Sequence, residues 1–330
     1  MSEDLDNNNV DSPSVLSAKL KRPNYNDNPY IRMPGGFSLE ALKSAIDYKP
    51  KPGDLFVVTY PKCGTTWMQY IVAVMMRKGR PVIDARDYLQ NSPFLEFTGV
   101  DAMEYMTDPG PIKTHLPFHL IPFSSQAKYI YVARNPKDCC VSFYHHTKSL
   151  PSYNFSDGTF DEFFEMFING QTDYGDYFDH HLSWYEHKNE PNIHFVTYED
   201  LKVDTKNEIL KLAKFLGEEH YKTLTNNPDI LDKVLEYSSI HYMKNSLNES
   251  FKHIFSPTSK TSDNMPSGVK AFNKYMAEHS WLVKNNEVEF VRKGVVGDWK
   301  NYFTPEQERR MEERIKEKTK DSDLMNIWKK

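Results

Sequence analysis

The residues with the clearest chemical potential lie in the segment TYPKCGTTW, residues 59–67, which follows a run of apolar residues. Lys62 supplies a positive charge, Gly64 lets backbone approach a ligand, and Thr65 and Thr66 carry hydroxyl donors. A helix that begins near Thr65 has unpaired N–H groups that favour an anion. We interpret the segment as a phosphate or sulfate site. The alternative is an ordinary strand-to-helix turn with a surface lysine.

This segment departs from the phosphate loop of nucleotide triphosphatases. A Walker loop has the pattern G-x-x-x-x-G-K-[ST], whereas here Lys62 precedes Gly64 and no glycine lies between Asp54 and Cys63. The order of these residues disfavours an ATP-hydrolysing enzyme or a P-loop kinase, which we keep as a second functional hypothesis.

A histidine is the side chain best suited to accept a proton at neutral pH, because its ordinary pKa is about 6.5. His115 lies in the segment KTHLP, just after an apparent strand and two residues from Lys113. Alternation along a strand places these two side chains on the same side. On local chemistry alone, His119, His145 and His146 are equal candidates for a general base.

Three strand-like runs, each followed by a helix, must position these residues. They cover residues 54–60, 128–135 and 192–200. Repeated strand-then-helix units predict an α/β fold, here a single domain with a central, mainly parallel sheet flanked by helices. The helix signals are a cap at Thr65 or Thr66 with Gly79 as stop, Pro136 at a first helical position, a Thr205/Glu208 capping box with Gly217 as stop, and a Thr304/Gln307 capping box.

The composition divides the chain into an extension and one domain. Residues 1–35 are rich in Asn, Asp, Ser and Pro and are predicted to form a flexible N-terminal extension. Residues 36–330 form the predicted domain. Within it, residues 245–290 are polar and turn-rich with aromatic islands, which predicts a lid or inserted loop.

Charge and cysteine usage exclude several classes of function. The net charge of −5 and the pI near 6.2 argue against nucleic-acid binding. The start of the chain is no targeting signal, and no run of about 18 apolar residues occurs, so we expect a soluble cytoplasmic protein without a membrane span. Three cysteines, two of them adjacent, suit neither a disulfide framework nor a zinc site. No metal-ligand motif is present, so we expect no metal.

Five segments together resemble the cytosolic sulfotransferases. The segment TYPKCGTTW is similar to the family's TYPKSGTTW, and it is followed in the family's order by KTHLP, YVARNPKDCCVSFYHH, TYED and RKGVVGDWKNYFT. The resemblance covers about residues 37–310. The last segment is long and highly specific, so chance agreement is negligible.

The resemblance implies that the donor is 3′-phosphoadenosine 5′-phosphosulfate (PAPS), which has two separate anionic ends. It implies that one loop, here P-loop-like, holds the 5′-phosphosulfate, that a second group holds the 3′-phosphate, and that aromatic residues contact the adenine. The expected donor contacts are Lys62, Cys63 through its backbone, Gly64, Thr65 and Thr66 at the 5′ end, Arg134, Ser142, Arg292, Lys293 and Gly294 at the 3′ end, Trp67 and Tyr198 at the adenine, and Ser238.

By the same resemblance, His115 is the general base, and Lys62 and Lys113 stabilise charge on the transferring sulfuryl group. Ser142 is expected to hold Lys62 away from the bridging oxygen until an acceptor binds. These roles agree with chemistry that needs positioning and positive charge more than covalent help. Lysines then supply the charge that magnesium supplies in kinases. A carrier that binds ligand without turnover is a third hypothesis, which these intact residues disfavour.

The acceptor is expected to be a small molecule with a hydroxyl group. Phe94 and Phe97 lie where the family builds aromatic walls of its acceptor pocket, beside Lys113 and His115, although they could also be plain core residues. His146 falls where phenol-sulfating relatives often have Phe. A phenol or a phenolic monoamine is therefore the expected acceptor.

Two departures from the family pattern bear on other properties. The dimer motif appears as Lys300, Thr304, Pro305 and Arg309, in which a proline removes a backbone donor and an arginine reverses a charge. This argues against dimerisation through that motif and leaves the oligomeric state open.

The second departure is Cys63, which replaces the usual Ser. Its position beside cationic residues predicts a lowered thiol pKa and a reactive thiol.

Overall fold

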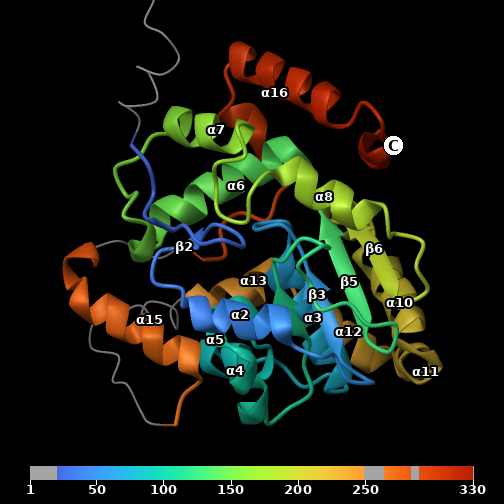
Figure 1. The fold of residues 1–330 in the computed structure, drawn as a ribbon. Helices are drawn as coiled ribbons and strands as arrows, with labels where there is room; N and C mark the ends of the chain where they lie inside the picture. The colour runs from blue at the N-terminus through green and yellow to red at the C-terminus, as the bar shows by residue number, and fades with distance from the viewer. Residues whose placement is uncertain (1–20, 249–263, 284–289, 330) are drawn as a thin grey trace, which may run out of the picture.

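The sheet that positions the site has four parallel strands in the order β4-β3-β5-β6. They are β3 (Leu55–Val58), β4 (Ile112–Thr114), β5 (Lys128–Ala133) and β6 (Ile193–Thr197). The computed structural model describes residues 21–248, 264–283 and 290–329 (Figure 1). The predicted α/β fold with a central parallel sheet and flanking helices is confirmed.

The register brings the carboxyl ends of the central strands together. Val58, the last residue of β3, pairs with Thr114 on one side and Tyr131 on the other. In turn, Ala133 at the end of β5 pairs with Thr197 at the end of β6. The loops that follow these strands therefore meet at one edge of the sheet, where parallel α/β folds bind ligands.

Alternation along the short strands places apolar side chains on both faces of the sheet. Leu55 and Val57 point to a cluster with α3 (Thr65–Met76), α10 and α12, whereas Phe56 and Val58 point to a cluster with α2 and α8. All four side chains are buried. Continuous burial of this kind is expected of a parallel strand covered by helices on both faces.

The remaining helices cover the faces of the sheet and the region beyond its carboxyl ends. The helices besides α3 are α2 (Leu39–Asp47), α4 (Ala85–Asn91), α5 (Leu95–Thr98), α6 (Pro136–Ser149), α7 (Phe160–Ile168), α8 (Tyr177–Tyr185), α9 (Tyr198–Val203), α10 (Thr205–Leu216), α11 (Glu218–Asn226), α12 (Pro228–Tyr237), α13 (Ile240–Met243), α15 (Ser267–Glu278) and α16 (Pro305–Lys318). In the described part of the chain, none of the helices is long and apolar enough to cross a membrane.

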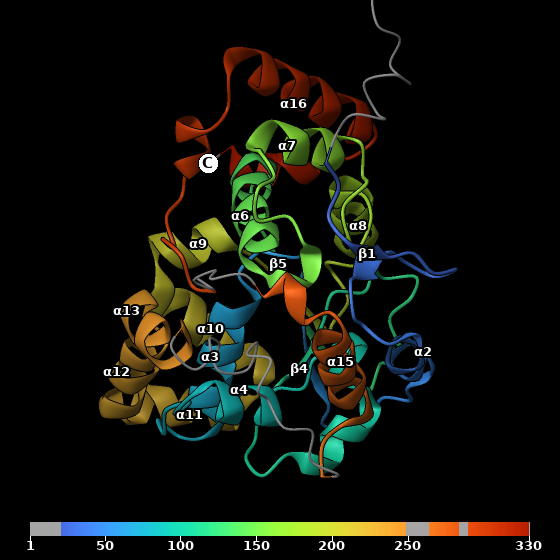
Figure 2. The same ribbon diagram turned by 90° about the vertical axis from the view of Figure 1, so that its left-hand side faces the viewer.

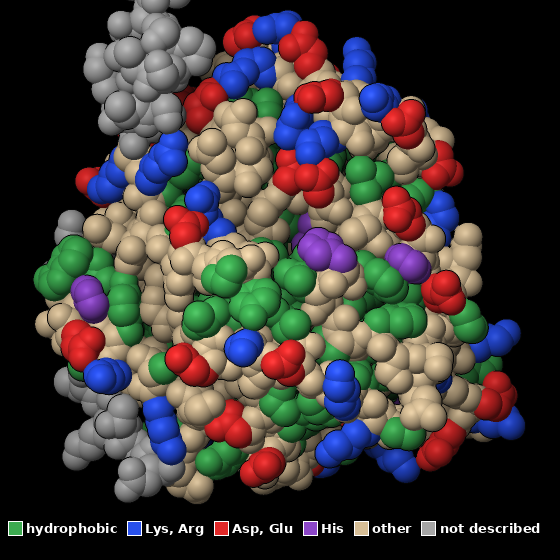
Figure 3. Space-filling view, in the orientation of Figure 1, with side chains coloured by type: hydrophobic (Ala, Val, Ile, Leu, Met, Phe, Trp, Pro, Cys, Tyr) green, Lys and Arg blue, Asp and Glu red, His purple; other side chains and the backbone are tan. Residues whose placement is uncertain are grey.

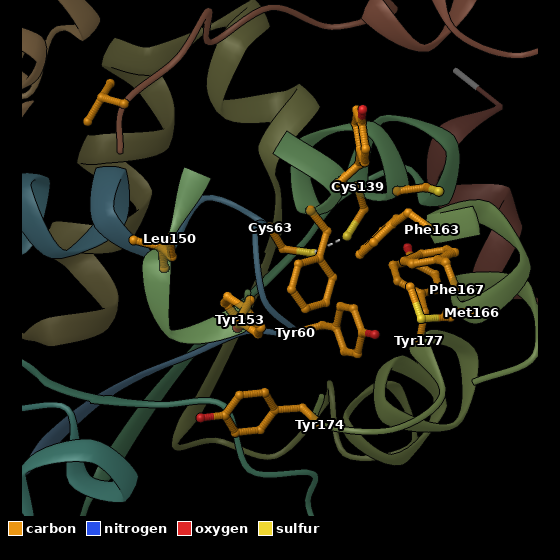
Figure 4. Packing of buried hydrophobic residues seen from close by; sticks show 14 of the residues in the cluster. Tyr60, Cys63, Cys139, Leu150, Tyr153, Phe163, Met166, Phe167, Tyr174 and Tyr177 are labelled. Atoms are coloured by element: carbon orange, nitrogen blue, oxygen red, sulfur yellow. Dashed lines mark hydrogen bonds between the residues drawn. The ribbon is translucent and has the colours of Figure 1, made fainter. Parts of the chain in front are cut away.

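A third apolar cluster lies beyond the carboxyl ends of the strands. Its aromatic residues come from the loop after β3 and from α6, α7 and α8, and they include Tyr60, Phe163, Phe167 and Tyr177 (Figure 4). Figures 1 and 2 show α6, α7 and α16 stacked above the sheet. Burial of these large rings stabilises the position of the loop at residues 59–67.

The surface carries charges of both signs. Figure 3 shows Lys and Arg interspersed with Asp and Glu over the visible face. Many of these charges form ion pairs within helices, such as that of Arg309 with Glu306 and Glu313 on α16. Arg309 thus has partners on its own helix, at a position where the sequence pattern argues against the family's dimer contact.

Two of the predicted helix caps are wrong. The N-cap of α3 is Gly64 rather than a threonine, because the loop turns with the left-handed φ of 104° that glycine tolerates. The N-cap of α10 is Asp204, whose side chain accepts the N–H of Asn207, while the Thr205 hydroxyl donates to the carbonyl of Leu201. The predicted Thr205/Glu208 box therefore does not form.

Other boundary signals are confirmed. The Thr304/Gln307 capping box opens α16, Pro136 occupies the first turn of α6, and Gly217 caps the end of α10. After α3 ends at Met76, the Gly79 N–H bonds the carbonyl of Val74 and closes the last turn.

Two predicted irregular segments contain regular structure. Within residues 21–35, assigned above to the flexible extension, Tyr25–Asn26 (β1) pairs with Met33–Pro34 (β2), and Met33 is fully buried. Within residues 245–290, α15 packs against α5 and α2. Residues 1–20, 249–263 and 284–289 of these two predictions lie outside the described residues.

Candidate active site

A cavity of about 460 Å³ opens at the carboxyl edge of the sheet. It is lined by residues from the loop after β3, from β4, from the end of β5, from α6 and from the segment before α16. The predicted site residues that line it are Lys62, Gly64, Thr65, Thr66, Trp67, Phe94, Phe97, Lys113, His115, Arg134, Ser142, His146, Tyr198, Ser238, Arg292, Lys293 and Gly294. One cavity therefore collects every predicted site residue except Cys63.

The loop at residues 59–67 has the geometry of an anion cradle. Gly64 caps α3 without a side-chain hydrogen bond, so N–H groups of the first turn remain available to a ligand. A Cβ at Gly64 would lie 2.8 Å from the ring of Tyr198, so a larger residue would close the cradle. Lys62 also has a positive φ, 68°, and its side chain lines the cavity.

The side chain of Cys63 faces away from the cavity, and the prediction of a lowered thiol pKa is wrong. Its side chain is fully buried, and its thiol lies 3.7 Å from that of Cys139 and 3.8 Å from Nε2 of His181 (Figure 4). Burial and the Cys139 thiol raise the pKa of Cys63 well above its ordinary value. Its backbone N–H donates to the carbonyl of Tyr60 at 3.3 Å. Cys63 is thus a packing residue whose buried thiol is protonated.

His115 is held in the tautomer that a general base requires. Its Nδ1 lies 2.7 Å from the carbonyl oxygen of Thr59, which can only accept a hydrogen bond. The proton therefore resides on Nδ1, and Nε2 carries the lone pair. Burial and the positive charge of Lys113 hold the pKa of His115 well below its usual range. The ring is neutral at physiological pH and ready to accept a proton.

The backbone of His115 is fixed by a buried carboxylate that the sequence analysis missed. Its N–H donates to Oε1 of Glu96 at 2.6 Å. Glu96 lies in the segment PFLEF, between the two phenylalanines that were singled out, so its position could have suggested this role. Burial raises the pKa of Glu96 to about 7.

Two of the other candidate histidines lie in different surroundings. His119 is exposed, and Nε2 of His145 lies 2.8 Å from the hydroxyl of Tyr302.

Two lysines of the cavity, Lys62 and Lys113, have lowered pKa values. Burial, together with the charges of Lys113 and Arg134, lowers the pKa of Lys62 to about 7. Burial lowers the pKa of Lys113 to about 8, although Glu96 opposes the shift. Lys113 also lies over the ring of Phe94, 3.9 Å from its centre. An anion bound here would restore the charge of both lysines.

Lys62 contacts His146 rather than Ser142. Its Nζ lies 3.3 Å from Nδ1 of His146, and it lies over the ring of Phe290 at 5.2 Å. Among the described residues no hydrogen bond joins Lys62 to Ser142. The restraint by Ser142 concerns the protein with its donor bound and stays a prediction. Burial and the charge of Lys62 hold the pKa of His146 well below its usual range, so its neutral ring can accept from the lysine.

The second cationic group lies where α6 approaches the segment before α16. Arg134 donates to the carbonyl of Lys62 at 3.0 Å, and its buried Nε has no partner among the described residues. Arg292 and Lys293 both lie near the carboxylate of Asp298, at 2.7 and 3.0 Å. Burial opposes ionisation of Asp298, but hydrogen bonds from Asn301, Lys293 and Arg292 outweigh it and lower its pKa to about 2.

Asp138 connects this segment to α6. Its carboxylate accepts hydrogen bonds from the N–H groups of Gly297 and Trp299, at 2.6 and 3.1 Å. Because Asp138 lies in the first turn of α6, these bonds join the two parts of the predicted 3′-phosphate site. The remaining donor capacity of a guanidinium, an ammonium and a serine hydroxyl fits a phosphate.

The predicted adenine contacts lie between the two cationic groups. Trp67 and Tyr198 meet edge to face with ring centres 5.3 Å apart, and Tyr198 lies beneath the guanidinium of Arg134 at 4.4 Å. Ser238 is buried and donates to the carbonyl of Val234. Ile240 also lines the cavity, and a Cβ at Gly294 would lie 2.6 Å from it. A flat apolar slot between two anion sites fits a nucleotide with phosphates at both ends.

The other end of the cavity is aromatic. Phe94 and Phe97 are half-buried and line it together with Phe37, which meets them at 5.8 and 4.9 Å between ring centres. Phe94 also meets the ring of His115 at 5.1 Å. The sequence analysis missed Phe37, Tyr174 and Phe290, because a single aromatic residue in a distant segment carries no local signal of its place in a pocket.

The fold and this cavity define an α/β enzyme that binds an adenine nucleotide with phosphates at two ends beside a neutral histidine. Among the described residues no group of three His, Cys, Asp or Glu side chains could hold a metal ion. Comparison with known proteins supplies the particular family. The sulfotransferase domain model matches residues 52–323, and the chain therefore belongs to the sulfotransferase family.

Its relatives have named activities. The chain is 36% identical to human sulfotransferase 1C2, over 81% of this chain and 83% of the relative. It is 34% identical to the amine sulfotransferase of rabbit, over 88% of each. The structure of mouse sulfotransferase SULT7A1 complexed with PAP matches with a TM-score of 0.66 and 28% identity, over 92% of this chain and 97% of that one. The chain is an enzyme whose donor is PAPS, of which PAP is the product.

Proposed function

We propose that the protein transfers the sulfuryl group of PAPS to the hydroxyl group of a small phenol or phenolic monoamine in the cytoplasm, with His115 as general base. The observation that carries the proposal is the position of His115 where the cationic and aromatic parts of one cavity meet. The neutral ring, with its lone pair on Nε2, can accept the proton of a hydroxyl that lies against Phe94.

Each residue then has a defined task. PAPS supplies an activated sulfuryl group when bound. When the acceptor oxygen replaces the bridging oxygen at sulfur, His115 would take the acceptor's proton at Nε2, and the electron pair of the broken bond would leave with the phosphate. Lys62 and Lys113 lie where they can stabilise the charge that develops on these oxygens. Arg134, Ser142 and the turn at residues 292–294 would hold the 3′-phosphate.

The aromatic walls support a ring-bearing acceptor. Phe37, Phe94 and Phe97 form a continuous apolar surface beside His115. The relative named an amine sulfotransferase supports the monoamine alternative, as does the polar His146 in the same wall. Three buried cysteines without a disulfide support the cytoplasmic assignment.

The test offers the purified protein PAPS with a panel of phenols, monoamines, steroids and aliphatic alcohols and measures the sulfated products. We expect transfer to phenols, with or without an amine, and less transfer to aliphatic alcohols. Retained PAP binding with transfer to no member of the panel would instead favour the carrier hypothesis. Transfer only to steroids or aliphatic alcohols would contradict the proposed acceptor class.

A further inference from the structure

A buried carboxylate lies at the acceptor end of the cavity. Asp173, in the loop between α7 and α8, lines the cavity with Tyr153 and Tyr174, although its side chain is only 1% exposed. Its Oδ2 accepts a hydrogen bond from the Tyr153 hydroxyl at 2.7 Å. Its Oδ1 is buried and has no hydrogen-bond partner among the described residues. A buried carboxylate with one empty acceptor site is costly unless a ligand completes it.

No cation within the described part of the protein pairs with this carboxylate. Arg32 is the nearby cation, but its guanidinium pairs with Asp27 and donates to the carbonyl of Gln171, each at 2.5 Å. Burial raises the pKa of Asp173 to about 7, and the Tyr153 hydroxyl, the backbone N–H of Asp173 and the charge of Arg32 oppose the rise. A cationic ligand group would lower this pKa again and replace the missing partner.

Asp173 lies near the part of the cavity that contains His115, but it is not one of the residues assigned to the transfer reaction. The next residue, Tyr174, meets the ring of His115 at 5.1 Å between centres. On the other side, the ring of Tyr153 lies 6.0 Å from that of His146, which contacts Lys62. A ring held between the aromatic walls, with its hydroxyl at His115, would extend a short side chain toward this carboxylate.

We propose that Asp173 binds the ammonium group of a phenolic monoamine while the phenolic hydroxyl faces His115. This inference rests on the proposed function, because it needs an acceptor in the same cavity. The inference adds Asp173 to the site as the residue that makes the protein bind a charged acceptor more tightly than a neutral one. The competing explanation is structural: the carboxylate only anchors the hydroxyl of Tyr153.

The test compares tyramine with 4-ethylphenol, which differs only in lacking the amine. Binding of each to the PAP complex is measured by isothermal titration calorimetry. We expect the wild-type protein to bind tyramine at least tenfold more tightly. Asp173→Asn, which keeps the shape of the side chain, should lose most of this preference and bind 4-ethylphenol almost as before. Asp179→Asn, which removes an exposed carboxylate of α8, should keep the wild-type preference.

Several results would overturn the assignment. Equal affinity of the wild-type protein for both compounds would do so without any variant, even if Asp173→Asn failed to fold. An equal loss of both affinities in Asp173→Asn would establish the structural explanation. Sulfuryl transfer is measured separately: equal transfer to both compounds, with equal affinity, would support the proposed function and refute the role of Asp173. Selective tyramine binding without transfer to any acceptor would refute the proposed function and support the ammonium site.

Discussion

The lowered pKa of Lys62 predicts that nucleotide affinity depends on pH. In the free protein its pKa is about 7, because burial and the charges of Lys113 and Arg134 oppose protonation. A phosphate beside the amine favours the charged form and returns the pKa toward the ordinary lysine value of about 10.4. Binding therefore takes up a proton. Because the free protein loses this proton above pH 7, affinity must fall as the pH rises.

The size of the effect follows from the fraction of charged Lys62. With a pKa of about 7, roughly a quarter of the free protein carries the charge at pH 7.5 and about 1% at pH 9. The Lys62 contribution alone should therefore raise the dissociation constant for PAP about twentyfold over this range, equivalent to about 2 kcal/mol. Lys113, whose pKa is about 8, should add a further rise above pH 8. Phosphate groups with a second pKa near 6 stay fully ionised over the same range, so they do not contribute.

Calorimetric titration of PAP into the protein at pH 7.5, 8.0, 8.5 and 9.0 measures this dependence. Repeating the titration at pH 8.0 in two buffers of different ionisation enthalpy, both free of phosphate and sulfate, counts the protons taken up. Lys62→Met should bind more weakly and lose the Lys62 part of the pH dependence, keeping the part that comes from Lys113. Lys113→Met is the matched control: it removes the other lysine and keeps the Lys62 amine, whose pKa should rise because a repulsive charge is gone. An equally steep dependence in Lys62→Met and in the wild-type protein would refute the reasoning.

Three further predictions concern other residues of the site. His115→Asn should lower turnover about 10²- to 10⁴-fold, the usual contribution of a general base, while PAP affinity in calorimetry stays unchanged; normal turnover would eliminate His115 as base. Gly64→Ala should lower the free energy of unfolding in urea by about 1–3 kcal/mol, because a Cβ meets the ring of Tyr198 at a positive φ. Gly53→Ala, also at positive φ but in open space, should cost less, and equal costs would contradict the steric argument. Cys63 should resist a thiol reagent in the native protein and react on unfolding, with or without PAP; rapid native labelling would show that the thiol is accessible.

The donor site could be predicted from the sequence because its chemistry is concentrated in short segments. The left-handed backbone at Gly64, the strand ending before Arg134 and the capping proline of α6 each leave a local mark in residue type and order. The parallel sheet then brings these segments together, since the carboxyl ends of its strands share one edge. The resemblance to the sulfotransferases, and not these local marks, predicted which segments act together on the donor.

The orientation of Cys63 could not be predicted in this way. The sequence places it next to Lys62, and proximity along the chain suggested a thiol in a positive site. The positive φ of Lys62 instead lets the lysine enter the cavity while the next side chain enters the core against Cys139. The pKa of a thiol depends on which side of the loop it faces, and that follows from the tertiary structure.

The residues that form the acceptor end of the cavity could not all be predicted, for a different reason. Its residues come from β2 and nearby chain, from α5, and from the loop before α8, and the chain has 20 phenylalanines and 20 tyrosines that could fill such positions. Asp173 carries no motif, and only its burial with an unpartnered oxygen distinguishes it from a surface aspartate. The packing of the folded chain brings these residues to the acceptor end, and no local sequence pattern shows that packing.

The contact between Lys62 and His146 joins the two ends of the site. His146 belongs to the acceptor wall, where its ring meets those of Tyr153 and Phe290, yet its Nδ1 lies 3.3 Å from the lysine of the donor loop. Because Lys62 loses its charge near pH 7 and His146 stays neutral, the contact is a hydrogen bond between neutral groups over much of the physiological range. Protonation of Lys62 on nucleotide binding strengthens its attraction to the phosphate more than to a neutral imidazole. We therefore expect donor binding to weaken the contact between Lys62 and His146.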